Sequence, residues 1–167
     1  MTLRIPENVI SRPLGQLQNI IAASAAFQAF VAAADANEAK LKVHLLHEPA
    51  AQAPYALVGF ASNWTFGRAT QQSQSASSFA SSGTTMLKFV ADTVLTTESD
   101  LANEMLGFSN TIGLIIEEMV SVSGTNGLAW IAGIYMTRPP QVAAIGKEGS
   151  KNRRMDVIFG IEFKDQA

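Results

Sequence analysis

The segment 97–124 restricts the fold more than any other part of this sequence. Its apolar residues follow one another in steps of four and three, at Leu101, Met105, Phe108, Ile112, Ile115, Met119 and Val122. This spacing keeps them on one side of an α-helix through about six turns. Thr97 with Asp100 fits a capping box at the start, and Gly124 fits a left-handed C-terminal cap. The pattern predicts a helix from about 98 to 123 whose apolar side packs on a second layer.

Short segments that alternate or are rich in β-branched and aromatic residues predict that the second layer is a sheet. They lie at 42–46, 55–66, 84–95, 128–137 and 155–163. Because consecutive strands usually pair, 55–66 and 84–95 are expected to form a hairpin. Its connection, at about 67–83, includes the uncharged stretch QQSQSASSFASSG and is much longer than a tight hairpin loop.

The N-terminal part of the chain predicts one more helix. Apolar residues at Leu17, Ile20, Ile21, Phe27 and Val31, with Ser24 on the same face, indicate a helix over about 14–34. Residues 1–13 contain Pro6 and Pro13 without periodicity and are expected to form an arm.

The order of these elements predicts a single α+β domain over 14–167. Its expected form is a mostly antiparallel sheet of four to five strands with two long helices packed on it. Pro139 and Pro140 are expected to end the strand predicted at 128–137. A basic loop at about 139–154 then leads to the last strand.

Composition narrows the class of function. The chain has no cysteine, which excludes disulfides, thiolate metal ligands and a cysteine nucleophile. The net charge of −2 argues against a dedicated nucleic-acid binder. Charged residues make up 16% of the chain, below the roughly 25% usual for soluble domains, so part of the surface is expected to be buried against other subunits. Neither a signal peptide nor a membrane span is expected, because the most apolar window, 20–34, is interrupted and short.

No pattern of residues indicates catalysis, a metal or a cofactor. His44 and His47 are the only histidines, and three positions apart on a strand they point to opposite faces. Glu117 and Glu118 are adjacent on a helix, which is typical of a solvated face rather than an acid/base pair. The sequence at Asn63 is a formal glycosylation acceptor that chance explains. We therefore do not expect an enzyme.

The basic segment KEGSKNRR allows two interpretations. The segment contains four basic residues and a single acidic one, Glu148; the basic residues are Lys147, Lys151, Arg153 and Arg154. They form either a solvated hairpin tip or a basic fringe that meets phosphate or an acidic partner. In a symmetric ring, the fringe repeats in every subunit.

The order of elements resembles that of the tail terminator (tail completion) proteins of long-tailed bacteriophages. The resemblance is carried by LGQLQNIIAASAAFQAFVAAAD, KVHLLHE, SSGTTMLKFVADTVL, ANEMLGFSNTIGLIIEEMVSVSG, MTRPPQ and DVIFGIEF, and covers the chain from about residue 14 to its end. It implies a structural virion protein that forms a ring, commonly a hexamer, on the head-proximal end of the tail tube. The implied partners are other copies of the chain, the tail tube protein, and a head-tail connector or neck protein. The resemblance also implies that DNA passes through the lumen without sequence-specific binding, and that the protein is found in the virion and, during assembly, in the host cytoplasm.

The resemblance leads to hypotheses for contact residues. Contacts with other subunits or the tube are expected at Leu3, Arg4, Ile5, Arg68, Gln74, Phe79 and Lys88. Contacts with the lumen or neck are expected at Lys147, Lys151, Arg153 and Arg154. The stretch 71–83 is expected to be flexible in the free subunit and to become ordered in the ring, with Phe79 as its apolar anchor.

Two alternatives stay open. The chain could be another head-to-tail connector or neck component. It could instead be a small ligand-binding or enzymatic α+β domain, which requires a concave pocket with convergent polar groups such as His44, His47 and a carboxylate.

Overall fold

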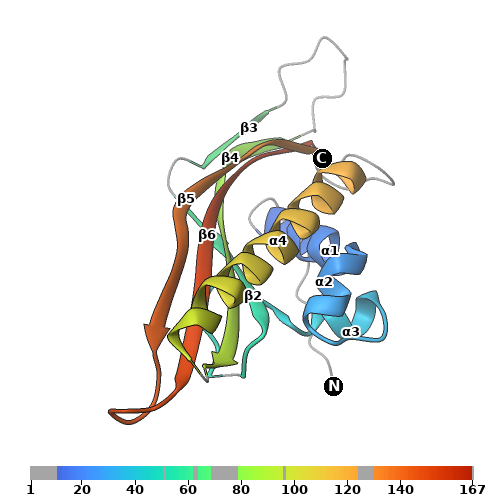
Figure 1. Ribbon diagram of the computed structural model, residues 1–167. Coiled ribbons are helices and arrows are strands. Elements are labelled where there is room, and N and C mark those ends of the chain that lie inside the picture. The colour runs from blue at the N-terminus through green and yellow to red at the C-terminus, as the bar shows by residue number, and fades with distance from the viewer. Residues whose placement is uncertain are drawn as a thin grey trace.

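Two layers make up the subunit, a curved β-sheet and a set of helices that cover one of its faces (Figure 1). The computed structural model describes residues 11–50, 52–61, 64–68, 79–95, 97–123 and 130–166. The helices are α1 (Ser11–Ala23), α2 (Ala25–Phe30), α3 (Ala36–Lys40) and α4 (Glu98–Val122). The strands are β1 (Val43–Leu45), β2 (Tyr55–Phe60), β3 (Thr65–Arg68), β4 (Phe79–Val94), β5 (Trp130–Ala144) and β6 (Asn152–Gln166). The predicted α+β class is confirmed.

The sheet is mixed but mostly antiparallel. Its strands follow the order β1-β2-β4-β6-β5, and β3 pairs with the first part of β4 outside this path. Only the pairing of β1 with β2 is parallel. The predicted pairing of 55–66 with 84–95 corresponds to the antiparallel β2–β4 ladder. Strands β1 and β5 are therefore the two opposite edges of the path.

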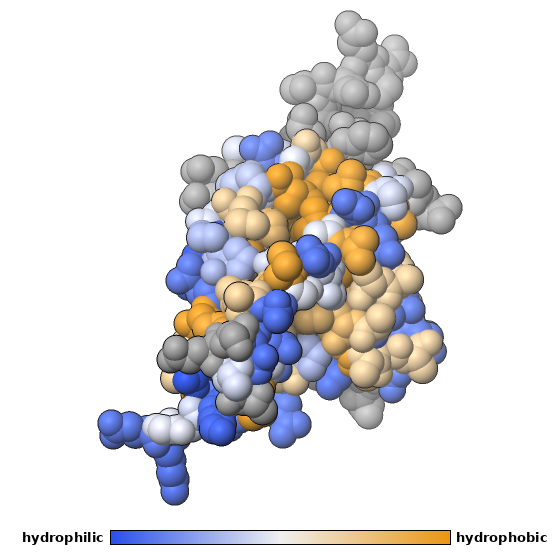
Figure 2. All heavy atoms as spheres, viewed as in Figure 1, coloured by the Kyte–Doolittle hydropathy of each residue, from blue (hydrophilic) through white to orange (hydrophobic). Residues whose placement is uncertain are grey.

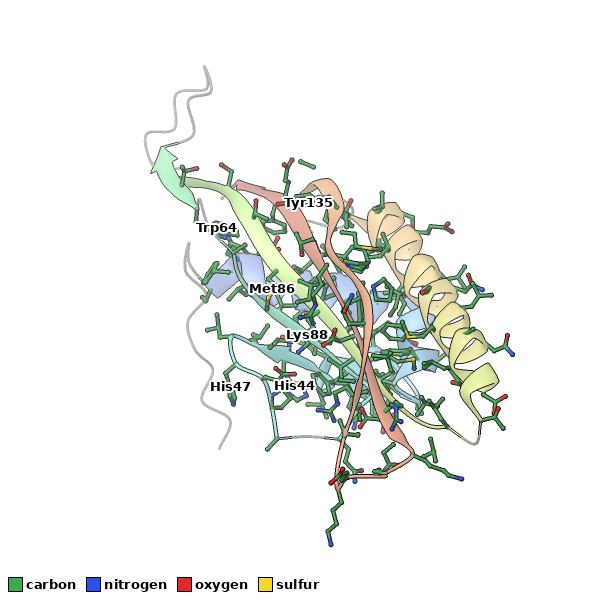
Figure 3. All side chains as sticks on the ribbon, turned by 60° about the vertical axis from the view of Figure 1, so that its left-hand side comes forward. His44, His47, Trp64, Met86, Lys88 and Tyr135 are labelled. Carbon is green, nitrogen blue, oxygen red and sulfur yellow. The ribbon has the colours of Figure 1, made fainter. Side chains whose placement is uncertain are left out.

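The register of the central strands separates the two faces of the sheet. Leu87 lies opposite Phe159, and Phe89 lies opposite Val157. These residues are buried under the helices. Their sequence neighbours point to the other face, which no helix covers in Figures 1 and 3 and which we call the open face.

The core lies between the helices and the covered face. A chain of aromatic rings connects the layers, with ring centres 6.2 Å apart for Phe27 and Phe89 and 6.3 Å apart for Phe89 and Phe159. Other buried side chains are Leu17, Ile20, Ile21, Val58, Leu87, Phe108, Ile112, Ile115, Met119, Val157 and Ile161. Each large side chain contributes about 1.5–3 kcal/mol when fully buried, so these contacts join the layers firmly.

Helix α4 agrees with its prediction. Phe108, Ile112, Ile115 and Met119 are buried in the core, and the flanking members of the apolar stripe are half-buried. At the start, the backbone N–H of Thr97 donates to the carboxylate of Asp100 (3.2 Å), as in a capping box. At the end, Ser123 is the C-cap in an extended conformation. The predicted cap at Gly124 lies outside the described residues.

The prediction of one long helix over 14–34 is wrong. Helix α1 ends at Ala23 and α2 starts at Ala25, because Ser24 is extended (ψ 122°) and caps α2. The hydroxyl of Ser24 accepts a bond from the N–H of Phe27 (3.0 Å). A further short helix, α3, is capped by Asp35. Only α4 is therefore long.

The boundary of the predicted arm at 1–13 also shifts. Helix α1 begins at Ser11, so Pro13 lies in its first turn. A proline is tolerated there because the N–H groups of the first turn have no partner within the helix.

The long connection between the predicted hairpin strands is partly strand. The predicted strand 55–66 is two strands, β2 and β3, and β4 begins at Phe79 rather than near 84. Residues 67–68 and 79–83 of the predicted loop therefore belong to the sheet, since β3 pairs with β4. The segment 69–78 lies outside the described residues, and with it the hypotheses on Gln74 and on loop flexibility.

The expectation that Pro139 and Pro140 end a strand is wrong. Strand β5 continues through both prolines to Ala144. This is possible because β5 is an edge strand, where a missing N–H can face solvent, and its register shifts at Met136/Arg138 and Arg138/Gln141. The predicted basic loop at 139–154 shortens to a turn at 145–151.

Candidate assembly surfaces

The first candidate surface is the outer face of α4, on the side turned away from the core. It consists of Leu106, Gly107, Asn110, Gly113, Leu114, Glu117 and Val120. Leu106, Leu114 and Val120 are 61%, 56% and 50% exposed. Figure 2 shows hydrophobic residues along this helix on the visible side of the molecule. A solvated helix face normally carries charged residues, so this composition is unusual for a surface that stays in water.

The glycines on the outer face of α4 have no packing role within the subunit. A Cβ atom added at Gly107 or Gly113 meets nothing within 4 Å. Glycine in a helix interior costs about 1 kcal/mol relative to alanine. No described contact within the subunit explains this cost, whereas the missing side chains let another chain approach the backbone closely.

Length and composition also make α4 a candidate membrane span. The segment Asp100–Val122 is long enough to cross a membrane, and its most apolar 18-residue window has a mean hydropathy of 1.2. A core helix meets the same criteria, and the inner side of α4 lies in the core. The feature that needs explanation is therefore its outer face.

The second candidate surface is the edge of the sheet at β1, which we call the β1 edge. It consists of Lys40, Leu41, Lys42, Leu46 and His47, all exposed. Leu41 is 75% exposed and Leu46 is 63% exposed. Leu46 has φ 70°, a left-handed conformation that costs a residue with a Cβ roughly 1–2 kcal/mol. An exposed leucine in this conformation therefore lowers the folding stability of the isolated chain.

These two surfaces lie on opposite sides of the subunit. Strand β1 is one edge of the sheet, and β5 is the other. Helix α4 contacts β4 and β5 and stands on the β5 side, whereas His44 and His47 mark the opposite side in Figure 3.

The third candidate surface is the tip of the β5–β6 hairpin, which projects from the body of the subunit (Figure 1). Its turn places Gly146 and Gly149 at φ 89° and 81°, a region that favours glycine. Lys147 and Lys151 are exposed there. The guanidinium of Arg153 donates to the carbonyl oxygens of Ser150 (2.7 Å) and Asn152 (2.9 Å), which holds it against the turn.

Arg154 does not belong to the tip. Its guanidinium donates to both carboxylate oxygens of Asp92, at 2.8 and 3.0 Å. This pairing raises the pKa of Arg154, with the hydrogen bond as the main cause. Three of the four predicted basic residues therefore remain together at the turn. Glu148 in the same turn offsets part of their positive charge.

The open face carries a network of charges around Lys88. Its ammonium group lies 2.8 Å from Glu48 and 3.7 Å from Asp156. Asp156 also pairs with Arg138 at 2.5 Å. The ammonium group of Lys88, predicted to contact another subunit or the tube, is thus paired within its own subunit.

Tyr55 joins this network. Its hydroxyl donates to Glu48 at 2.8 Å. Burial, followed by the bond to Glu48, raises the pKa of Tyr55 to about 12. The bonds from Lys88 and then Tyr55 lower the pKa of Glu48. The network therefore favours the charged form of the Glu48 carboxylate and the neutral form of the Tyr55 phenol.

Two aromatic residues lie close against glycines of the sheet. Trp64 lies over Gly83 and donates from Nε1 to the carbonyl oxygen of Thr84 (2.9 Å). Tyr135 lies over Gly160, where a Cβ atom would meet its ring. Figure 3 shows both residues with Met86 and Lys88. Close by is a shallow cavity of about 230 Å³, which is lined by Ser82, Gly83, Thr84, Ala132, Glu162 and Phe163.

The histidines do not gather with other ligands. The ring of His44 packs edge-on against Tyr55 (5.5 Å), and burial, followed by Lys42 and His47, lowers its pKa. His47 lies beyond the end of β1 rather than on the strand. Within the described residues, no three His, Cys, Asp or Glu side chains lie close enough to hold a metal ion. Neither histidine lines the shallow cavity.

Glu118 has a role that the sequence did not indicate. Its carboxylate accepts bonds from the hydroxyl of Ser24 (2.7 Å) and the N–H of Ala26 (3.0 Å), so it caps α2 from α4. The bond from Ala26, followed by that from Ser24, lowers its pKa. The prediction of a solvated face thus holds for the exposed Glu117 but is wrong for Glu118.

Several predicted contact residues cannot be placed on these surfaces. Leu3, Arg4, Ile5 and Gln74 lie outside the described residues, and so does Asn63 of the formal glycosylation acceptor. Arg68 and Phe79 are opposite one another in the β3–β4 ladder, and their side chains lie outside the described part. Neither apolar surface was predicted from the sequence, although the absence of any lysine or arginine between 98 and 122 is a signal of the first.

Comparisons with known proteins give a likeness to a solved structure. No family model matches the chain, and no curated protein matches it. A chain in a structure described as "Virion of native gene transfer agent (GTA) particle" aligns with a TM-score of 0.38 and 12% identity. The alignment covers 98% of this chain and 99% of that one. A TM-score of this size does not establish a shared fold, so this likeness carries no argument about function.

Proposed function

We propose that this protein is a structural virion component that assembles into a ring without catalysing a reaction. The ring caps the head-proximal end of a phage tail tube and joins it to the connector or neck, as the resemblance of the sequence to tail terminators implies. A hexamer is the expected size of the ring. The protein is then found in the virion, and in the host cytoplasm during assembly.

One observation carries the proposal of a ring. Exposed leucine and valine side chains gather on the outer face of α4 and on the β1 edge, on opposite sides of the subunit. A ring is built from a head-to-tail contact, in which each subunit offers two different surfaces. Burial of these surfaces between subunits also removes apolar groups from water.

The hairpin tip is proposed to supply the contact with the lumen or neck. Lys147, Lys151 and Arg153 repeat in every subunit of a ring, so a small patch on one subunit becomes a positive band. Such a band attracts phosphate without reading a sequence. The whole chain has a net charge of −2, so this attraction is a local property of the tip and not of the entire surface.

Light scattering after size exclusion and negative-stain electron microscopy test the proposal. We expect one oligomer with a mass of several subunits, visible as rings, that co-sediments with purified tail tubes and appears at one end of them. A protein that stays monomeric at all concentrations and does not bind tubes would contradict it.

A connector or neck protein is the rival within the same class. Such a protein forms rings as well but binds to the head vertex rather than to the tube. Electron microscopy of the protein mixed separately with tail tubes and with DNA-filled heads distinguishes them. The described cavity of about 230 Å³ gives no support to the ligand-binding alternative, because neither histidine lines it.

A further inference from the structure

We propose that the outer face of α4 docks on the β1 edge of a neighbouring copy of this chain. The inference rests on the proposed ring and names the contact that builds it. Three observations on the described residues support it: apolar exposure on both surfaces, opposite charge, and position.

Both surfaces offer apolar groups that the subunit does not cover. The α4 side supplies Leu106, Leu114 and Val120, and the β1 side supplies Leu41 and Leu46. Gly107 and Gly113 leave open space between the leucines of α4. Leucines from a second copy can enter this space and pack against the helix backbone.

The acidic character of α4 disfavours a second α4 as its binding partner. Helix α4 has no lysine or arginine, and its carboxylates are Glu98, Asp100, Glu104, Glu117 and Glu118. Asp100 caps α4 and Glu118 caps α2, so Glu104 and Glu117 are the described carboxylates that remain at its surface. A second α4 would bring like charges together, and these repel.

The β1 edge has the opposite charge. Lys40 and Lys42 flank Leu41 there, and neither forms an ion pair with a described carboxylate. Packing of α4 on this edge therefore brings carboxylates to ammonium groups at the rim of an apolar contact, which is the usual anatomy of a specific interface.

Position makes this contact able to repeat. Because β1 and β5 are opposite edges of the sheet and α4 stands on the β5 side, each copy can bind one neighbour on each side. A two-fold dimer would use the same surface on both copies and would stop at two. The observed arrangement favours a series of identical contacts that closes into a ring.

Disulfide trapping tests the contact, and the absence of native cysteine makes it direct. A variant with both Leu46→Cys and Leu114→Cys, oxidised while assembled, is expected to give a ladder of covalent species up to the full ring. Each single variant is expected to stay monomeric on a denaturing gel. Leu114→Cys with Val142→Cys, where Val142 is exposed on β5, is the matched control and should give no ladder.

The possible results are distinguishable. Oxidation of Leu114→Cys alone to a dimer would show that α4 pairs with α4 and would overturn the inference. Rings that form normally without a ladder would overturn this contact but leave the proposed function standing. A strict monomer that neither assembles nor binds tubes would overturn both, and so would a monomer whose α4 instead binds phosphatidylglycerol vesicles.

An exchange of charges gives a second, independent test. Glu117→Lys and Lys42→Glu are each expected to weaken assembly by about tenfold in the dissociation constant, and the double variant to recover most of the loss. Both positions are exposed, so folding should be unaffected. Unchanged assembly in both single variants would contradict the inference.

Discussion

Glu118 shows how one side chain fixes the relation between two helices. Its carboxylate accepts bonds from Ser24 and from the backbone of Ala26, so α4 supplies a cap that α2 needs. Ser24 itself is buried, and its hydroxyl has a partner on each side. This small network explains why the N-terminal helical segment breaks where it does, since an extended Ser24 gains more bonds than a helical residue at that position.

The pH dependence of stability should report this cap. Because the pKa of Glu118 is lowered in the folded state, its contribution is present above its ordinary value of 4.5 and is lost as pH falls through the folded value. Glu118→Gln is expected to destabilise the protein more at pH 7 than at about pH 3. Urea midpoints at both pH values measure this, with exposed Glu117→Gln as the control. An equal difference at both pH values would contradict the assignment.

Two glycines should respond to alanine with opposite signs. Gly113→Ala adds a methyl group in open space, so we expect a gain of about 1 kcal/mol in the free energy of unfolding. Gly83→Ala places a Cβ atom 2.8 Å from the Trp64 ring and 2.9 Å from its backbone, and such overpacking typically costs about 1–3 kcal/mol. Chemical denaturation of both variants as monomers tests the pair. Two changes of the same sign would show that the contacts differ from those described.

At the scale of elements, α4 has two apolar sides with different roles. The side with Ile115 holds the helix on the sheet, whereas the side with Leu114 faces away from it. The regular spacing of the first side predicts where the helix packs. The second side has no partner among the described residues, and the proposed assembly is based on this exposure.

Alanine at these adjacent positions separates the two roles. Ile115→Ala is expected to cost about 2–5 kcal/mol of folding free energy, because it leaves a cavity in the core. Leu114→Ala should change the stability of the monomer by less than about 0.5 kcal/mol but should weaken assembly. Denaturation at low concentration and light scattering at high concentration measure the two effects. Loss of monomer stability in Leu114→Ala would place that side chain in the core instead.

At the scale of the whole molecule, the helices cover only one face of the sheet. The open face is stabilised by its own ion pairs, such as Lys88 with Glu48 and Arg154 with Asp92. The exposed leucines lie on the outer face of α4 and on the β1 edge, while other exposed apolar side chains, such as Val94, Tyr135 and Met136, lie on β4 and β5. The proposed ring contact uses the leucines, because they lie on opposite sides of the molecule.

Assembly should make thermal stability depend on concentration. Since neighbours bind only folded subunits, we expect the Tm to rise over about a 100-fold increase in protein concentration. Leu114→Glu should give a lower Tm that no longer changes with concentration. Differential scanning fluorimetry measures both proteins. A Tm of the unaltered protein that stays constant over this range would contradict assembly through the outer face of α4.

The sequence predicted the features that repeat along the chain. The three- and four-residue steps from Leu101 to Val122 and the alternation in 84–95 and 155–163 determined α4, the central strands and the α+β class, because burial of one face imposes these periods. The pairing of 55–66 with 84–95 followed from sequence proximity. The predicted antiparallel pairing is confirmed, but the predicted boundaries of both strands are wrong.

Only the tertiary structure decided the features that depend on neighbours distant in sequence. The break at Ser24 depends on Glu118, which lies far along the chain, and β5 tolerates Pro139 and Pro140 because it became an edge strand. The surfaces of α4 and β1 were likewise visible only after folding, since exposure is a property of what the rest of the chain leaves uncovered. Local periodicity thus determined the elements, whereas contacts between distant residues decided their ends, their caps and the faces left free to bind another copy.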